Sequence, residues 1–200
     1  MNTKSLVRFA AVAAFALAPG LADAHTGLGH VDGFAHGFAH PLGGLDHVLA
    51  MVMVGLFAAQ LGGRARWLVP ASFLAAMVAG GALGFAGVGV PFVELGIGLS
   101  IVVLGGVVAF NLQAGVTVAM ALVGFFAVFH GYAHGAEMPE SASGLAYGAG
   151  FALATALLHA AGLGVGLALD GKAGARRAMV VRSIGALVAF AGIGVVTGLV

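Results

Sequence analysis

Six long apolar segments, separated by short polar connections, most strongly limit what this chain can fold into. Each is close to the roughly 20 residues that an α-helix needs to cross a lipid bilayer. Only 8% of the residues are charged and 61% are hydrophobic, whereas soluble domains carry about 25% charged residues. We therefore predict an all-α, polytopic membrane helix bundle, with residues 42–200 as its single transmembrane domain. The predicted spans are residues 42–61, 67–87, 91–111, 114–131, 144–169 and 178–199.

Residues 1–24 have the three parts of a cleavable secretory signal peptide. A positively charged start precedes an apolar stretch, residues 9–18, that is too short to span a bilayer. A small-residue cleavage site then ends at Ala24. A retained anchor helix is the alternative interpretation. Cleavage would place His25 at the new N-terminus, where a free amine beside an imidazole chelates Ni²⁺ or Cu²⁺ well.

Residues 25–41 form a His-rich segment that precedes the first predicted span. Such a tract is a compositional indication of metal binding. Asp32, His36 and His40 are spaced i, i+4, i+8, so a helix would align them on one face. A flexible polar linker after the signal peptide explains the same composition, and the sequence leaves both interpretations open.

Lysine and arginine side chains predict the orientation of the bundle. By the positive-inside rule, the connections that carry them face the cytoplasm. The first and fifth connections between the predicted spans carry these residues. The third connection lies on the same side, because successive spans cross the membrane in opposite directions. A cleaved signal places the N-terminus outside, and six spans return the C-terminus to that side, so we expect a multi-pass protein of the bacterial inner membrane with both termini periplasmic. The basic residues after the signal are Arg64, Arg66, Lys172, Arg176, Arg177 and Arg182.

The predicted orientation gathers imidazoles and carboxylates at the periplasmic end of the bundle. These groups are the ligands that Ni²⁺, Co²⁺ and Zn²⁺ accept, and the chain has no cysteine to supply a thiolate. Burying an unpaired Asp in a membrane helix costs roughly 2.5–3.5 kcal/mol, which favours a functional role. We therefore predict one bound divalent metal ion and no prosthetic group. The predicted ligands are His40, Asp46, His47, Glu94, His130, His134 and Glu137.

Spacing supports two parts of this site. His130, His134 and Glu137 are spaced i, i+4, i+7 at the end of the fourth and shortest predicted span, within about 60° on a helix. Solvated groups at a helix end are the alternative. Asp46 and His47 point about 100° apart, so one would bind the ion and the other would support it. Stabilisation by the helix dipole alone would also explain Asp46.

Other polar side chains are weaker candidates. An acid in the first turn of a helix, such as Glu94, is equally explained by stabilisation of the helix end. His25 and His36 belong to the His-rich segment. His159 lies past the middle of the fifth span, where it is an inner relay for an ion or, by the preferred interpretation, a neutral imidazole bonded to a backbone carbonyl. Met51 follows His47 by one helical turn, and either ion contact or packing explains it.

Two motifs resemble the signatures of the HupE/UreJ family. Residues 40–51 resemble the pattern HPxxGxDHxLxM, and residues 130–139 resemble HGxAHGxExP. Members of that family are small secondary permeases taken to import nickel, or cobalt, for hydrogenase or urease maturation. The resemblance covers nearly the whole chain. It implies a pathway that includes His40, Asp46, His47, His134 and Glu137, with Glu94 and Phe73.

We therefore expect a secondary transporter that imports Ni²⁺ or Co²⁺, and not an enzyme. The sequence has no nucleotide-binding P-loop, and a membrane potential of about 100 mV supplies roughly 4.6 kcal/mol for a divalent ion. A membrane-embedded zinc hydrolase and a channel for a small neutral solute are the alternatives. A net charge of +1 without a basic tract indicates no nucleic-acid partner. Whether the chain forms a homo-oligomer is left open.

Overall fold

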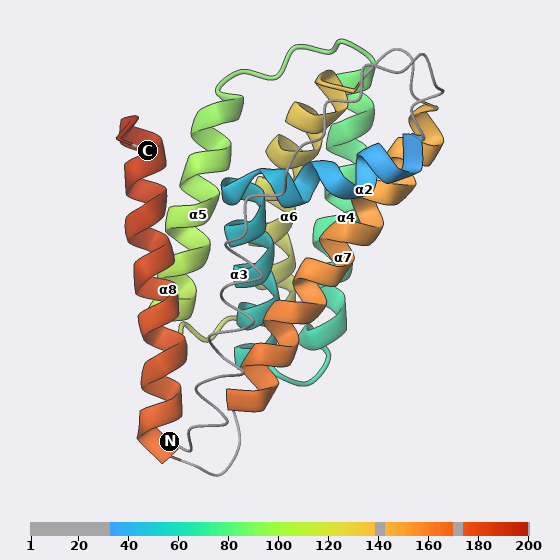
Figure 1. Ribbon diagram of the computed structural model, residues 1–200. Helices are drawn as coiled ribbons and strands as arrows, with labels where there is room; N and C mark the ends of the chain where they lie inside the picture. Colours follow the sequence, from blue (N-terminus) through green and yellow to red (C-terminus); the bar gives the residue numbers. More distant parts are fainter. Residues whose placement is uncertain (1–32, 139–142, 170–173, 200) are drawn as a thin grey trace.

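The computed structural model describes residues 33–138, 143–169 and 174–199, which form an all-helical bundle (Figure 1). This confirms the predicted all-α class, and every predicted span contains a helix. The predicted signal peptide, residues 1–24, and the candidate ligand His25 lie outside the described residues. The helices are α2 (Gly33–Gly43), α3 (Leu45–Leu61), α4 (Ala65–Phe85), α5 (Val93–Ala109), α6 (Val116–Ala136), α7 (Gly144–Leu169) and α8 (Gly174–Thr197).

The lengths of the helices fit a multi-pass membrane protein. Helices α4, α6, α7 and most of α8 are long and apolar enough to cross a bilayer, and α2 with α3 passes the same test as one broken span. Helix α5 is apolar but has only 17 residues. At a rise of 1.5 Å per residue it is about 26 Å long, slightly less than the roughly 30 Å of hydrocarbon that it would cross.

The long helix of the first span begins later than predicted, at Leu45 instead of residue 42, after an extended Gly44. Pro41 is buried near the end of the separate helix α2 that precedes it. Proline removes a backbone hydrogen bond, and glycine is a poor helix former, so Pro41, Gly43 and Gly44 together end one helix before the next begins. The two helices meet at 83°, and α2 runs crosswise over the upright helices (Figure 1).

The fourth span is longer than predicted. Helix α6 continues to Ala136 instead of ending at residue 131, and Glu137 is its C-cap residue. His130 and His134 are therefore one turn apart on the same helix, and Glu137 follows at its end. The predicted i, i+4, i+7 spacing thus falls on one continuous helix and its cap.

Close backbone contacts hold the helices in pairs. Helix α4 packs against α6, α5 against α8, and both α2 and α3 against α7. Glycine permits such close approach between membrane helices. A Cβ atom on Gly55 of α3 would overlap the carbonyl oxygen of His159, and one on Gly37 of α2 would overlap that of Tyr147. These contacts set the positions of α2 and α3, and of the histidines that they carry, relative to α7.

The two ends of the bundle differ in charge. Arg64 and Arg66 lie at the turn between α3 and α4. Arg182, from α8, donates a hydrogen bond through Nε to the carbonyl oxygen of Ala109 at the end of α5, at 2.8 Å. The starts of α3 and α5 and the end of α6, where the described acidic residues lie, are at the opposite end (Figure 1). The order of the apolar segments predicts this separation of the acidic residues from the basic ones.

Gly55→Ala tests the contact between α3 and α7. Alanine improves helix propensity by about 1 kcal/mol at any exposed helical glycine, but at Gly55 the added methyl group meets a backbone oxygen that cannot rotate away. We expect overpacking to cost about 1–3 kcal/mol. The matched control is Gly164→Ala on α7, where a Cβ atom meets nothing within 4 Å. Thermal unfolding in detergent, followed by circular dichroism, should give Gly55→Ala the lower melting temperature, and the reverse order would contradict the packing described.

Candidate metal centre

His40, His134 and Glu137 converge where α2 crosses the end of α6. Each offers one ligand atom, and these atoms all lie within 4.8 Å of one another. Nε2 of His40 is 3.7 Å from Oε2 of Glu137, and the ring centroids of His40 and His134 are 4.9 Å apart. Two imidazoles and a carboxylate are a donor set that Ni²⁺, Co²⁺ and Zn²⁺ accept. We call these three residues the outer group.

The outer group is accessible from one end of the bundle. The side chain of His40 is 30% exposed and that of Glu137 is 63% exposed, whereas His134 is half-buried. A carboxylate at the mouth attracts a cation, and the imidazoles behind it can replace water molecules of its hydration shell. The arrangement therefore suits capture of an ion from the aqueous side.

Two further imidazoles lie deeper in the bundle. His47 of α3 and His130 of α6 are fully buried. The ring centroid of His47 is 5.1 Å from that of His134 and 5.3 Å from that of His130. His134, His47 and His130 therefore form a continuous row of rings from the outer group into the core.

The row carries nitrogen atoms that the described residues leave without hydrogen bonds. Nδ1 of His47, His130 and His134 is buried, and it has no partner among the described side chains and backbone. A buried polar atom without a hydrogen bond costs about 1–3 kcal/mol. Three such atoms on neighbouring rings are an arrangement that a cation with a preference for nitrogen ligands would stabilise.

Hydroxyl groups hold the opposite nitrogens of the two inner rings. Nε2 of His47 shares a hydrogen bond with Oγ1 of Thr155 on α7, at 3.1 Å. Nε2 of His130 lies 2.8 Å from Oγ of Ser100 on α5. Both hydroxyl residues are fully buried. Each inner imidazole is thus oriented by a neighbouring helix through one nitrogen, while the described part of the chain offers no hydrogen-bond partner to the other nitrogen.

Asp46 supports the start of α3. Its Oδ1 accepts a hydrogen bond from the backbone N–H of His47, at 2.8 Å. The two neighbouring side chains diverge: the imidazole of His47 faces the inner rings, and the half-buried carboxylate of Asp46 turns back to the backbone. Asp46 is also an acid in the first turn of a helix, where the dipole stabilises it.

Two further candidates, His36 and Glu94, are exposed and lie outside the row of buried rings. His36 is exposed on α2, and its ring centroid is 5.9 Å from that of His40. Glu94 is exposed in the first turn of α5 and is not part of the outer group. The seven predicted ligands therefore do not meet at one point: three form the outer group, and His47 and His130 lie beneath it.

Phe73 and His159 extend the row toward the other end of the bundle. The ring of Phe73 is fully buried, with its centroid 6.0 Å from that of His130 and 5.1 Å from that of His159. His159 is 2% exposed, and neither of its ring nitrogens has a hydrogen-bond partner among the described residues. The expected bond from His159 to a backbone carbonyl is therefore not formed within the described part of the chain. Met51 is fully buried in the hydrophobic core.

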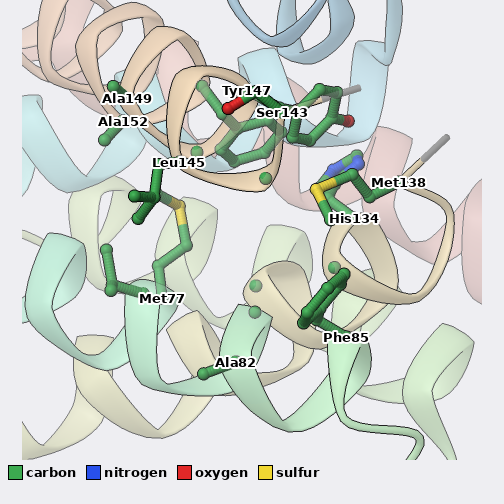
Figure 2. A pocket seen from close by; sticks show the side chains of 17 residues that line it. Met77, Ala82, Phe85, His134, Met138, Ser143, Leu145, Tyr147, Ala149 and Ala152 are labelled. Atoms are coloured by element: carbon green, nitrogen blue, oxygen red, sulfur yellow. The ribbon is translucent and has the colours of Figure 1, made fainter. Parts of the chain in front are cut away.

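An apolar pocket adjoins the outer group. It has a volume of about 700 Å³ and lies between α4, α6 and α7 (Figure 2). His134 lies at its edge, near Met138, and its other walls include Met77, Phe85 and Leu145. Because these walls supply few polar atoms, the pocket could hold an apolar group beside the imidazoles but could not itself coordinate an ion.

Three residues that contact the imidazoles were not predicted from the sequence. Ser100 and Thr155 hold the inner rings, and the ring of Phe151 packs against His47 and His134 at centroid distances of 5.0 and 4.6 Å. A signal was present for the hydroxyl groups, because each is an isolated polar residue within an apolar span. Phe151 carries no such signal, since aromatic residues are common in apolar helices.

Comparisons with known proteins agree on one family. The family model described as HupE / UreJ protein matches residues 12–195. Protein HupE of Rhizobium leguminosarum bv. viciae is 46% identical over 187 residues, which cover 94% of this chain and 95% of that protein. No solved structure matches the chain.

Glu137→Gln tests the outer group. The amide keeps the shape of the carboxylate but removes its charge, so we expect Ni²⁺ to bind at least tenfold more weakly, because even residues that only support a ligand change metal affinity by about 10–100-fold. Calorimetric titration of the purified protein, carrying an affinity tag without histidine, would measure this. The control is Gln113→Ala, an exposed polar residue at the opposite end. Unchanged affinity in Glu137→Gln would remove this carboxylate from the site.

Proposed function

The chain belongs to the HupE/UreJ family, and we propose that it is a secondary permease that imports Ni²⁺, with Co²⁺ as the alternative cargo, across the bacterial inner membrane. The observation that carries this proposal is the row of imidazoles. It begins at a partly exposed group with a carboxylate and continues through fully buried rings to the middle of the bundle.

The row supports a stepwise path for the ion. A cation held by His40, His134 and Glu137 has the ring of His47 next to it, and His130 follows within a similar distance. Each step exchanges one nitrogen ligand for a neighbouring one, so the ion is never left without ligands in an apolar medium. Asp46 would act by holding the start of α3, and hence His47, in position.

The inner half of the path passes an aromatic ring. Phe73 lies between His130 and His159, and it is the side chain that an ion leaving the inner imidazoles would have to displace. His159 would then receive the ion, since both of its nitrogens are without partners among the described residues. This order gives Phe73 the role of a barrier and His159 that of an inner ligand.

The membrane potential is sufficient to drive such transport. A divalent ion moving inward across about 100 mV gains roughly 4.6 kcal/mol, which corresponds to about three decades in concentration. Entry from the periplasm requires the outer group to face that side. The arginines at the opposite end of the described bundle support this orientation through the positive-inside rule.

The apolar pocket beside His134 supports one alternative. A metal held by the outer group could activate water against an apolar substrate in that pocket, as in a membrane-embedded zinc hydrolase. A hydrolase, however, has no use for His130 and His159, which do not line the pocket and are fully or almost fully buried. The transporter accounts for all of these imidazoles.

Uptake of radiolabelled Ni²⁺ by cells expressing the protein tests the proposed function. We expect Asp46→Asn and His134→Ala to lower uptake at least tenfold, because the first removes the negative charge next to His47 while keeping the hydrogen-bond acceptor, and the second removes a ligand of the outer group. Gln113→Ala should transport like the unaltered protein, with expression compared by immunoblot. A hydrolase would give no metal flux in any variant, and a neutral-solute channel would be insensitive to a chelator. Normal uptake by His134→Ala would contradict the proposed path.

Single cysteines test the orientation, since the chain has none of its own. Val88 in the α4–α5 connection and Gln113 in the α5–α6 connection are both exposed and lie at opposite ends of the bundle. In spheroplasts, a membrane-impermeant maleimide should label Val88→Cys directly and Gln113→Cys only after the membrane is disrupted. The opposite pattern would place the outer group in the cytoplasm and rule out capture from the periplasm.

A further inference from the structure

Ser100 connects two groups in the core of the bundle. Its side chain is fully buried on α5. Oγ lies 2.6 Å from the carbonyl oxygen of Ile97, one turn earlier on the same helix, and 2.8 Å from Nε2 of His130 on α6. One hydroxyl group thus bridges the backbone of one helix and an imidazole of another.

The geometry determines which atom donates in each bond. A carbonyl oxygen has no proton, so the bond between Ser100 and Ile97 must use the single hydroxyl proton. Toward His130 the hydroxyl oxygen can then only accept, and Nε2 of the imidazole must carry the proton. A neutral imidazole has one N–H, so Nδ1 of His130 carries the lone pair. That atom is the buried nitrogen without a hydrogen-bond partner among the described residues.

We propose that Ser100 is a positioning residue that holds His130 in the tautomer protonated on Nε2, so that Nδ1 is a buried ligand for the transported ion. This inference rests on the proposed function. Histidines that bind metals generally donate their other N–H to a fixed acceptor, which sets the tautomer and the orientation of the ring. In this chain the acceptor is a hydroxyl oxygen whose own proton is fixed by Ile97.

The chemical class of the ion follows from this ligand. A neutral nitrogen donor favours Ni²⁺, Co²⁺ and Zn²⁺, whereas Mg²⁺ and Ca²⁺ prefer oxygen ligands. The outer group contains a carboxylate that could hold either class. The inner imidazoles offer nitrogen alone, so they would add to the selection against oxygen-binding cations that His40 and His134 begin, and Ser100 contributes to it through His130.

Ser72 is a useful comparison for Ser100, because it makes the same type of backbone hydrogen bond. Ser72 on α4 also donates to the carbonyl oxygen three residues earlier, that of Val69, at 2.8 Å. Among the described residues, Ser72 has no imidazole partner. Ser72→Ala therefore removes the same hydroxyl and the same type of backbone bond, and it is a matched control for Ser100→Ala.

The experiment compares Ser100→Thr with Ser100→Val, which have the same shape and differ only in the hydroxyl. We expect Ni²⁺ uptake in the valine variant to be about 10–100-fold below that in the threonine variant. We also expect Ser100→Ala to fall by a similar factor, and Ser72→Ala to be unchanged. Thermal unfolding of each variant checks that the bundle is intact. If neither β-branched residue is tolerated, the comparison of Ser100→Ala with Ser72→Ala decides the question.

A spectroscopic readout separates this inference from the proposed function. In protein labelled with ¹⁵N-histidine and studied in micelles without metal, the His130 ring should show its proton on Nε2, with the signals assigned by their absence in His130→Gln. Ser100→Ala should show a mixture of tautomers. If unaltered protein takes up no Ni²⁺ but the tautomer shifts, the proposed function fails and the positioning holds. If uptake is normal and neither uptake nor tautomer changes in Ser100→Ala, the role of Ser100 is overturned.

Discussion

The need to satisfy polar atoms inside an apolar bundle is the constraint on which the rest of this structure depends. A helix in lipid satisfies its own backbone, but an imidazole placed in its interior must find partners from other helices or from a ligand. Here each inner imidazole has one nitrogen bonded to a hydroxyl group and one nitrogen without a partner among the described residues. The hydroxyl groups thus satisfy Nε2 of each inner imidazole, and Nδ1 is the atom that a ligand of the bundle would have to satisfy.

Close helix packing makes this arrangement possible. The imidazoles come from α2, α3, α6 and α7, and the hydroxyl groups from α5 and α7, so five of the seven described helices contribute polar side chains to the row or to its hydrogen bonds. Ring centroids about 5 Å apart require the helices that carry them to approach closely. Glycines provide this approach, as at Gly55, where α3 rests directly on the backbone of His159. The glycine content of the chain is thus linked to the geometry of the site and not only to its stability.

Local patterns in the sequence predicted the helices, their class and the separation of charge between the two ends, because hydropathy and the distribution of arginine act along the chain. The same patterns placed the candidate ligands at one end. They could not predict that α2 turns aside at Gly44, because that depends on how α2 packs against α7. Nor could they predict the pairing of Ser100 with His130, since the rotation of each helix about its axis is set by its neighbours. The helix that carries His36 and His40 was one of two interpretations that the sequence left open.

The sharp angle between α2 and α3 has a mechanical consequence. His40 and His47 are close in the chain, yet they lie on two helices that leave Gly44 in different directions. Each helix is seated on α7 through its own glycine, Gly37 for α2 and Gly55 for α3. The distance between the two imidazoles is therefore set by α7, which acts as a common ruler for both, and not by the short stretch of chain that joins them.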